Sequence, residues 1–199
     1  MELRPSFDED LDLLYALATN DACFWWRSSF LGQPTPGNIV AKLEHDCVML
    51  YVAESEGERV GASSLYEYSK QSDTVWLDVV MIPAYRYRRH EATSLALDAA
   101  FANWSARKVY ALHHEFESSP FEGLSCQWQQ EGHLAGRLRR GGRYWDQFIC
   151  SVYRDDWRAA AGPPNVVDPE RQNSTPMVQA TRSETSKRDD RNSSRDGDS

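Results

Sequence analysis

Cysteine is scarce in this chain of 199 residues, and its four cysteines, Cys23, Cys47, Cys126 and Cys150, lie far apart. No CxxC pair occurs and no cysteine stands near a histidine at zinc-site spacing, so a metal site is not expected. The chain opens with the charged stretch MELRPSFDED and not with a secretory signal. These features predict reduced thiols and a cytoplasmic location.

Long apolar runs are also missing, since no stretch approaches the ~18 apolar residues that a membrane helix needs. A basic balance is missing as well, because 30 acidic residues outnumber 22 basic ones and the formal net charge is -8. Neither a membrane nor a nucleic-acid backbone is therefore an expected partner, since nucleic acids are bound by clustered Lys and Arg. Local basic clusters at Arg86, Arg88 and Arg89 and between Arg137 and Arg143 could still hold one small anion.

Apolar residues make up 41% of the chain, including seven Trp, nine Tyr and seven Phe, which is enough for a substantial core. The composition changes at Ala161-Gly162-Pro163-Pro164, beyond which nearly every residue is polar, charged or proline. Such a segment cannot bury enough apolar surface to offset the entropy of ordering. We therefore expect one domain over residues 1–162 and a disordered polar tail over residues 163–199.

The pattern before that boundary alternates between helices and strands. A short strand at ELR precedes a helix in FDEDLDLLYALAT, for which Ser6 is a suitable N-cap. The further helices that we expect are ACFWWRSSF, NIVAKLEHD, EATSLALDAAFANWSA, SSPFEGLSCQW and DDWRAAA. The further expected strands are CVMLYVAES, RVGASSLYEYS, DTVWLDVVMIP, KVYALHHEF, GHLAGRLRR and RYWDQFICSVYR. Gly141-Gly142 predicts a two-residue hairpin turn, and the whole order indicates a mixed α/β architecture with two crossover helices.

Glycine is absent from one place where it is usual. The stretch YRRHEAT, residues 87–93, lies between the strand DTVWLDVVMIP and the alanine-rich helix. Strand-to-helix turns often bind phosphate, because the N–H groups and positive dipole end of the helix face an anion there. Such turns are usually rich in glycine, whereas this one has Arg88, Arg89 and His90.

Three strings give the chain a resemblance to a known family: LRPSFDEDLDLLYALAT, YVAESEGERVGASSLYEY and EGHLAGRLRRGGRYWDQFICSVYRDDW. Together with the order of elements, they resemble the GNAT (GCN5-related N-acetyltransferase) superfamily, and above all its branch of ribosomal-protein alanine acetyltransferases. The likeness covers roughly residues 2 to 157, and the closing hairpin is its most specific part. It implies a single domain with a mostly antiparallel twisted sheet, a splayed pair of parallel strands and flanking helices.

The resemblance also implies a place for acetyl-CoA in the gap between the splayed strands. The pantetheine would pair with Val79, Val80 and Met81, and the pyrophosphate would lie on the following turn. The cofactor-binding residues of that turn would be Arg88, Arg89, His90, Glu91, Ala92 and Thr93. The turn departs from the family motif Gln/Arg-x-x-Gly-x-Gly/Ala, because Tyr87 replaces the first residue and His90 the first glycine. If His90 had to be left-handed, the strain would cost about 1 kcal/mol.

Transfer of an acyl group from a thioester to an amine needs a neutral amine, a donor for the oxyanion and a proton for the leaving thiolate. The branch pattern Asn-x-x-Ser falls on Phe116 to Ser119, which makes Ser119 the candidate acid. Its alternative role is the N-cap of the next helix. Candidates for the base are Asp78, His113, His114 and Glu117, of which Asp78 and His114 are preferred. A strand directs only one of the two histidines to the cleft, and an ordered water could also relay the proton.

The resemblance thus predicts an N-acyltransferase that uses acetyl-CoA, needs no metal, and acts on a primary amine of a small molecule or peptide. Net acidity favours a cationic amine, and the protein would be a monomer or homodimer. Phe24, Trp25, Trp26 and Phe30 would lie in a substrate-binding helix, where they either pack in the core or line the acceptor pocket. The alternatives are a catalytically inactive ligand- or protein-binding module of the same fold, and an enzyme with another acyl donor.

Overall fold

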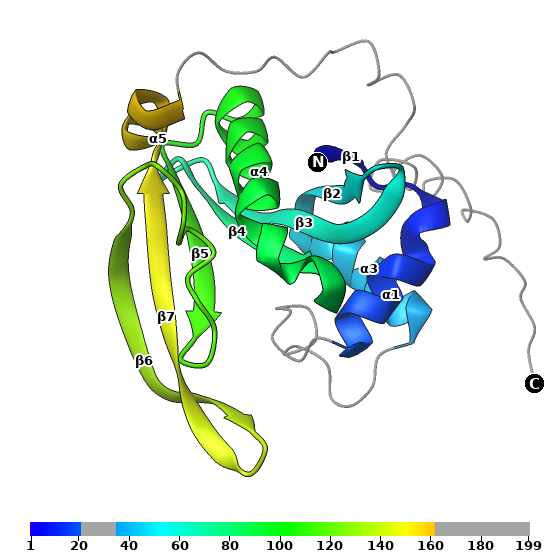
Figure 1. Cartoon of the computed structure of the whole chain (residues 1–199). Helices are drawn as coiled ribbons and strands as arrows, with labels where there is room; N and C mark the ends of the chain where they lie inside the picture. Colours follow the sequence, from blue (N-terminus) through cyan, green and yellow to red (C-terminus); the bar gives the residue numbers. More distant parts are fainter. Residues whose placement is uncertain (21–34, 162–199) are drawn as a thin grey trace, which may run out of the picture.

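A computed structural model describes residues 1–20 and 35–161 of the chain (Figure 1). Its sheet has seven strands in the order β1-β2-β3-β4-β5-β7-β6. The strands are β1 (Glu2–Pro5), β2 (Cys47–Ser55), β3 (Glu58–Ser69), β4 (Thr74–Met81), β5 (Lys108–His114), β6 (Gln129–Arg140) and β7 (Arg143–Tyr153). Neighbouring strands are antiparallel except β4 and β5, which are parallel. The predicted mostly antiparallel sheet in a mixed α/β fold is confirmed.

Helices flank this sheet. They are α1 (Leu11–Asn20), α3 (Pro36–Asp46), α4 (Arg89–Asn103) and α5 (Arg154–Ala161), with two 3₁₀ segments, η1 (Asp8–Asp10) and η2 (Pro83–Arg88). The predicted aromatic helix ACFWWRSSF, with Phe24, Trp25, Trp26 and Phe30, lies outside the described residues, as does the predicted tail over residues 163–199.

The alternation of side chains along β4 separates two cores. Val79 and Met81 pack in the core that contains α4, whereas Val80 packs in the core that contains α1 and α3. Figure 1 shows α4 lying across the strands on one side, with α1 and α3 away from it. The indole N–H of Trp157 in α5 donates to Asp98 in α4 at 2.9 Å, which ties α5 to the same side as α4. Helices on both faces therefore hold β4 in place.

The parallel strands β4 and β5 separate part of the way along. Their pairing runs from Thr74 with Lys108 to Leu77 with Ala111. Beyond that last pair β4 continues to Met81, while β5 continues to His114 in register with β7. The two strands therefore leave a gap in the middle of the sheet, which is the predicted splay.

The structure corrects the predicted start of the first helix. Ser6 is not its N-cap, because the 3₁₀ segment begins after Phe7, whose N–H donates to the Asp10 carboxylate at 2.9 Å. Asp10 is fully buried and also accepts two hydrogen bonds from Arg4, at 2.7 and 2.8 Å. A carboxylate fixed by a guanidinium is a stronger acceptor than a hydroxyl, so it determines the helix start.

A second correction concerns the segment SSPFEGLSCQW, which forms turns and bends in place of the predicted short helix. Gly123 has a φ of 83°, a left-handed conformation that interrupts a right-handed helix after one turn. The sheet therefore has one crossover helix, α4, where two were predicted. The predicted hairpin turn is present: Gly141 and Gly142 have φ values of 58° and 80°, as a type I′ turn requires.

Candidate functional site

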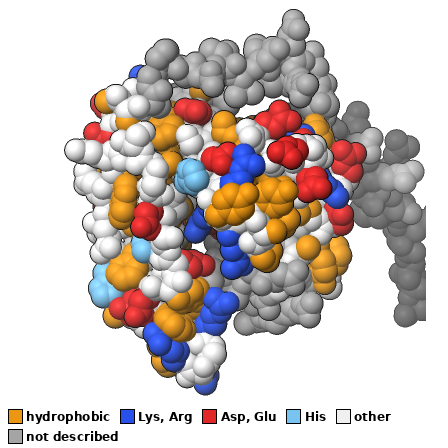
Figure 2. Space-filling view, viewed as in Figure 1, with side chains coloured by type: hydrophobic (Ala, Val, Ile, Leu, Met, Phe, Trp, Pro, Cys, Tyr) orange, Lys and Arg blue, Asp and Glu red, His pale blue; other side chains and the backbone are white. Residues whose placement is uncertain are grey.

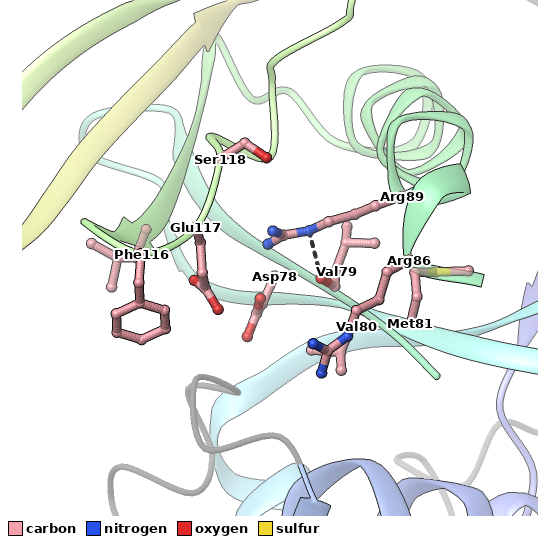
Figure 3. Close-up of a pocket in the computed structure, with 10 residues that line it drawn as sticks. Asp78, Val79, Val80, Met81, Arg86, Arg89, Phe116, Glu117 and Ser118 are labelled. Carbon is pink, nitrogen blue, oxygen red and sulfur yellow. Dashed lines mark hydrogen bonds between the residues drawn. The ribbon is translucent and has the colours of Figure 1, made fainter. Parts of the chain in front are cut away.

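A cavity of about 280 Å³ lies in the gap between β4 and β5. It is lined by β4, by the first turns after β4, by β5 and by the segment that follows β5 (Figure 3). The lining residues are Asp78, Val79, Val80, Met81, Arg86, Arg89, Leu112, Phe116, Glu117 and Ser118. The cavity therefore contains Asp78 and all three β4 residues predicted to pair with a cofactor.

The main chain of β4 faces this gap at alternate residues. The N–H of Ile82 donates to the Val60 carbonyl of β3 at 2.9 Å, so the even-numbered residues of β4 direct their main-chain groups towards β3. The Asp73 carbonyl accepts from the start of β5, which shows that the odd-numbered residues direct theirs towards β5. Val79 and Met81 are odd-numbered, and β5 has already diverged from β4 at their level. Their peptide groups therefore point into the gap.

Two carboxyl groups enter the cavity at the end nearest β5. Asp78 comes from β4, and Glu117 comes from the turn after β5, where its N–H donates to the His114 carbonyl at 2.9 Å. Figure 3 shows both carboxyl groups directed into the same part of the cavity. This end can attract an ammonium group and can accept a proton from it.

Two guanidinium groups also line the cavity, from Arg86 in η2 and Arg89 at the start of α4 (Figure 3). The Arg89 N–H donates to the Arg86 carbonyl, a 3₁₀ bond that places these two side chains on the same side of the chain. Basic side chains also gather along the hollow between the β5–β7 part and the α4 part of the surface (Figure 2). The cavity therefore combines two carboxyl groups with two guanidinium groups.

Arg88 points elsewhere, although it was predicted to contact the cofactor. Its guanidinium donates two hydrogen bonds to Glu91, at 2.7 and 2.6 Å, and one to the Ser55 hydroxyl at 2.6 Å. The hydrogen bonds and charge of Arg88 lower the pKa of Glu91. Neither side chain is part of the cavity lining, so an anion at the turn would meet Arg89 and not this ion pair.

The turn needs no glycine in this structure. His90 lies within α4, and the positive φ values of non-glycine residues in the described chain belong to Glu56, Glu67 and Asp73. The cost of a left-handed His90 therefore does not arise. The Tyr85 N–H donates to Ile82 and the Arg89 N–H to Arg86, so part of the predicted amide cradle is already hydrogen-bonded within η2.

The remaining predicted turn residues do not line the cavity. Ala92 and Thr93 are buried in α4, and the Thr93 hydroxyl donates to the Arg89 carbonyl at 2.9 Å. His90 is exposed, and Tyr87 is 73% exposed. Of the six residues proposed for the pyrophosphate turn, Arg89 alone belongs to the cavity lining.

Ser119 and His114 lie behind the cavity wall. The Ser119 hydroxyl accepts the Phe121 N–H at 3.2 Å within a turn. Its predicted alternative role as a helix N-cap is wrong, because the segment that follows it forms turns and bends and not a helix. The His114 ring stacks on Phe116 with centroids 5.4 Å apart, and its Nδ1 lies 3.4 Å from Glu117. His114 therefore positions two lining residues, and a catalytic role for it or for Ser119 stays a prediction.

His113 is not part of the cavity lining either. Its ring stacks on Phe148 with centroids 5.1 Å apart. Burial lowers the pKa of His113, and the positive charge of Arg89 adds to this effect. The fold therefore disfavours the protonated form of this imidazole.

The sequence arguments for the site overlooked Ser118, Leu112 and the role of Arg86. A signal for Arg86 was available, because arginines three residues apart lie on one side of a 3₁₀ turn.

Phe116 forms a wall of the cavity, and the edge of Trp145 from the β6–β7 hairpin supports it at 4.8 Å between centroids. No spacing in the sequence indicates this contact, because it depends on how the hairpin folds over β5.

In the described ranges, no group of His, Cys, Asp and Glu side chains could hold a metal ion. Over the same ranges, none of the helices has the length and apolar character to cross a membrane. Cys47, Cys126 and Cys150 are buried free thiols, and burial raises the pKa of Cys126 and Cys150. Nothing at the cavity therefore indicates metal ligation among the residues described.

Solved structures with a similar fold include several N-acetyltransferases. The spermidine N-acetyltransferase from Vibrio cholerae, in complex with CoA and spermine, is 18% identical, with a TM-score of 0.66, over 78% of this chain and 96% of that chain. A mutant of the same Vibrio cholerae enzyme is 19% identical with the same TM-score of 0.66, over 79% of this chain and 97% of that chain. A protein provisionally named as a phosphinothricin N-acetyltransferase is 18% identical, with a TM-score of 0.61, over 76% of this chain and 96% of that chain.

No protein-family model and no curated protein sequence matches this chain. At such low identity the structural likeness establishes the fold, which is the GNAT fold predicted from the sequence. The narrower resemblance to ribosomal-protein alanine acetyltransferases stays a prediction.

Proposed function

We propose that this protein is an N-acyltransferase that transfers an acetyl group from acetyl-CoA to a primary amine of a small molecule or peptide. The observation that supports this proposal most strongly is the cavity between β4 and β5, which is lined by β4 peptide groups, two carboxyl groups and two guanidinium groups. The likeness to N-acetyltransferases supports this proposal, and one of those structures contains CoA and spermine. The cytoplasmic location predicted from the sequence is proposed along with it.

The residues at the gap fit the thioester end of the donor. Ligand pockets usually measure roughly 300–1,000 Å³, so a cavity of about 280 Å³ suits an acetyl group and part of a pantetheine. The peptide groups of Val79 and Met81 would bind the extended pantetheine as an added strand. Arg86 and Arg89 would hold the diphosphate outside the cavity, at the start of α4.

The acidic end would receive the acceptor amine. Asp78 and Glu117 would attract it as an ammonium ion and accept the proton that it must lose, directly or through a water. The nitrogen then bonds to the carbonyl carbon, a β4 N–H donates to the oxyanion, and the carbon–sulfur bond breaks. Two serines are the candidates for returning a proton to the sulfur: Ser118, which lines the cavity, and Ser119 behind it.

A second function, an inactive module of the same fold that binds a ligand or a protein, is favoured by one observation. The turn after β4 uses the Tyr85 and Arg89 N–H groups internally and binds Arg88 to Glu91. A diphosphate would therefore find fewer donors than a glycine-rich turn offers. The two functions differ in whether acetyl-CoA is consumed.

The test is release of CoA from acetyl-CoA in the presence of a panel of primary amines, with acetylated product identified by mass spectrometry. The double variant Asp78→Asn/Glu117→Gln should lower kcat/KM on the order of 10²-fold, the usual contribution of acid–base catalysis. Glu122→Gln is the matched control, because Glu122 is exposed, lies five residues from Glu117 and is not part of the cavity lining. Amine-independent CoA release, or unchanged activity of the double variant, would contradict the assigned chemistry.

A further inference from the structure

We propose that Arg89 is a selectivity gate, which closes the pantetheine groove and opens for acyl donors that carry a diphosphate. This inference rests on the proposed function and assigns one residue of the same site a second role. It concerns the choice of donor, not the chemical step.

The gate is defined by one hydrogen bond. The Nε of Arg89 donates to the Val79 carbonyl at 3.0 Å, which links the start of α4 to β4 (Figure 3). Val79 belongs to the β4 residues whose peptide groups face away from β3 and into the gap. The side chain of Arg89 therefore occupies an acceptor that an extended ligand would need.

A ligand that adds along β4 must displace this bond. Strand addition gains its affinity from main-chain hydrogen bonds, and the Val79 carbonyl cannot serve Arg89 and a ligand amide equally well. Breaking a hydrogen bond from a charged donor lowers affinity about tenfold unless the donor finds a new partner. A donor without a diphosphate offers Arg89 no such partner.

A diphosphate supplies the missing partner. Arg89 is the first residue of α4, next to Arg86, so its guanidinium can turn from the gap to an anion at the start of the helix. Guanidinium groups bind phosphate oxygens in pairs, and the helix dipole adds to the attraction. Arg88 cannot substitute for Arg89, because Glu91 and Ser55 already hold its guanidinium. Opening the groove and binding the diphosphate are therefore one movement of one side chain.

The test compares two donors, acetyl-CoA and S-acetylpantetheine, in calorimetric titrations of the full-length protein and its variants. Arg89→Ala should bind S-acetylpantetheine about tenfold more tightly, because the Val79 carbonyl is released, and acetyl-CoA about tenfold more weakly, because a phosphate ligand is lost. Arg89→Met, which keeps an unbranched apolar stem, should behave in the same way and guards against a folding defect in the alanine variant.

Arg88→Ala is the matched control, since it removes the same charge one residue earlier without releasing Val79. Its affinity for S-acetylpantetheine should equal that of the wild type. The gate is refuted if both Arg89 variants shift the two donors in the same direction while the wild type binds acetyl-CoA. If no form of the protein binds either donor, the proposed function falls as well, so the two failures are distinguishable.

Discussion

His113 is a residue near the site whose protonation depends on the fold. Burial against Phe148, together with the charge of Arg89, lowers the pKa of His113 below its usual value of 6.5. The unfolded chain therefore binds this proton at a higher pH than the folded chain does. The stabilisation that comes from neutral His113 is present above the pKa that His113 has in the unfolded chain. It is lost as the pH falls through the lower pKa that His113 has in the folded chain.

Replacing His113 with Gln should make stability less sensitive to acid. Urea unfolding between about pH 7 and pH 5, which spans the usual His pKa, measures the effect. The wild type should lose more free energy of unfolding over this interval than His113→Gln, and exposed His45→Gln is the control for loss of an imidazole. Equal losses in the wild type and His113→Gln would show that His113 is not held neutral.

Single residues also mark the limit of prediction from sequence. Strand alternation and the resemblance placed Asp78 and Val79–Met81 at the gap, because a strand fixes side-chain direction at once. The same reasoning chose Ser119 and overlooked Ser118, and it preferred His114 to Glu117, although Ser118 and Glu117 are the residues that line the cavity. His114 is the last residue of β5 and the other three follow it, where a turn and not a repeating strand geometry decides which side chain enters the cavity.

At the scale of elements, the strand pair β3–β4 holds the site in place through a close approach at Gly61. A Cβ atom at Gly61 would lie 2.5 Å from the Val80 carbonyl oxygen and 2.6 Å from the Met81 sulfur. Gly61 is paired with Met81, at the level where β4 lines the cavity. The glycine is therefore required by the packing of β4 and not by its own backbone conformation.

The variant Gly61→Ala should destabilise the protein by about 1–3 kcal/mol, the usual cost of forcing an atom into a packed core. Gly37→Ala is the matched control, because the nearest atom to a Cβ at Gly37 in α3 is 4.0 Å away. Thermal or urea unfolding of both variants decides the matter. A Gly61→Ala protein as stable as the Gly37→Ala protein would mean that β4 shifts freely, which contradicts a rigid site.

Elements with a strong repeating pattern were predictable, and those set by a few local contacts were not. The strands and α4 follow from alternation, from apolar length and from the turn residues between them. The start of α1 depends on Asp10, which Arg4 fixes across six residues, and SSPFEGLSCQW fails as a helix at Gly123. The turn after β4 was expected to be an open amide cradle, yet η2 forms there because no glycine interrupts the helical bonds.

At the scale of the whole molecule, the sheet order creates the site. The chain passes from β4 through α4 to β5, and the two strands pair in parallel as far as Leu77 and Ala111. Beyond that pair β5 stays in register with β7 and separates from β4. A gap therefore opens beside the start of α4. Both acidic and basic groups then line this gap, although the chain carries a net charge of -8. The account as a whole depends on the donor binding in this gap.

Hydrogen–deuterium exchange of the full-length protein, with and without acetyl-CoA, tests that claim most directly. The account predicts slower exchange in peptides that contain Val79–Met81 and Arg86–His90 once acetyl-CoA is added, because a ligand strand would cover the β4 amides. Protection should disappear once acetyl-CoA, together with any CoA formed from it, is removed by dialysis. Unchanged exchange at millimolar acetyl-CoA, or protection confined to other parts of the chain, would contradict the proposed acyl-donor site.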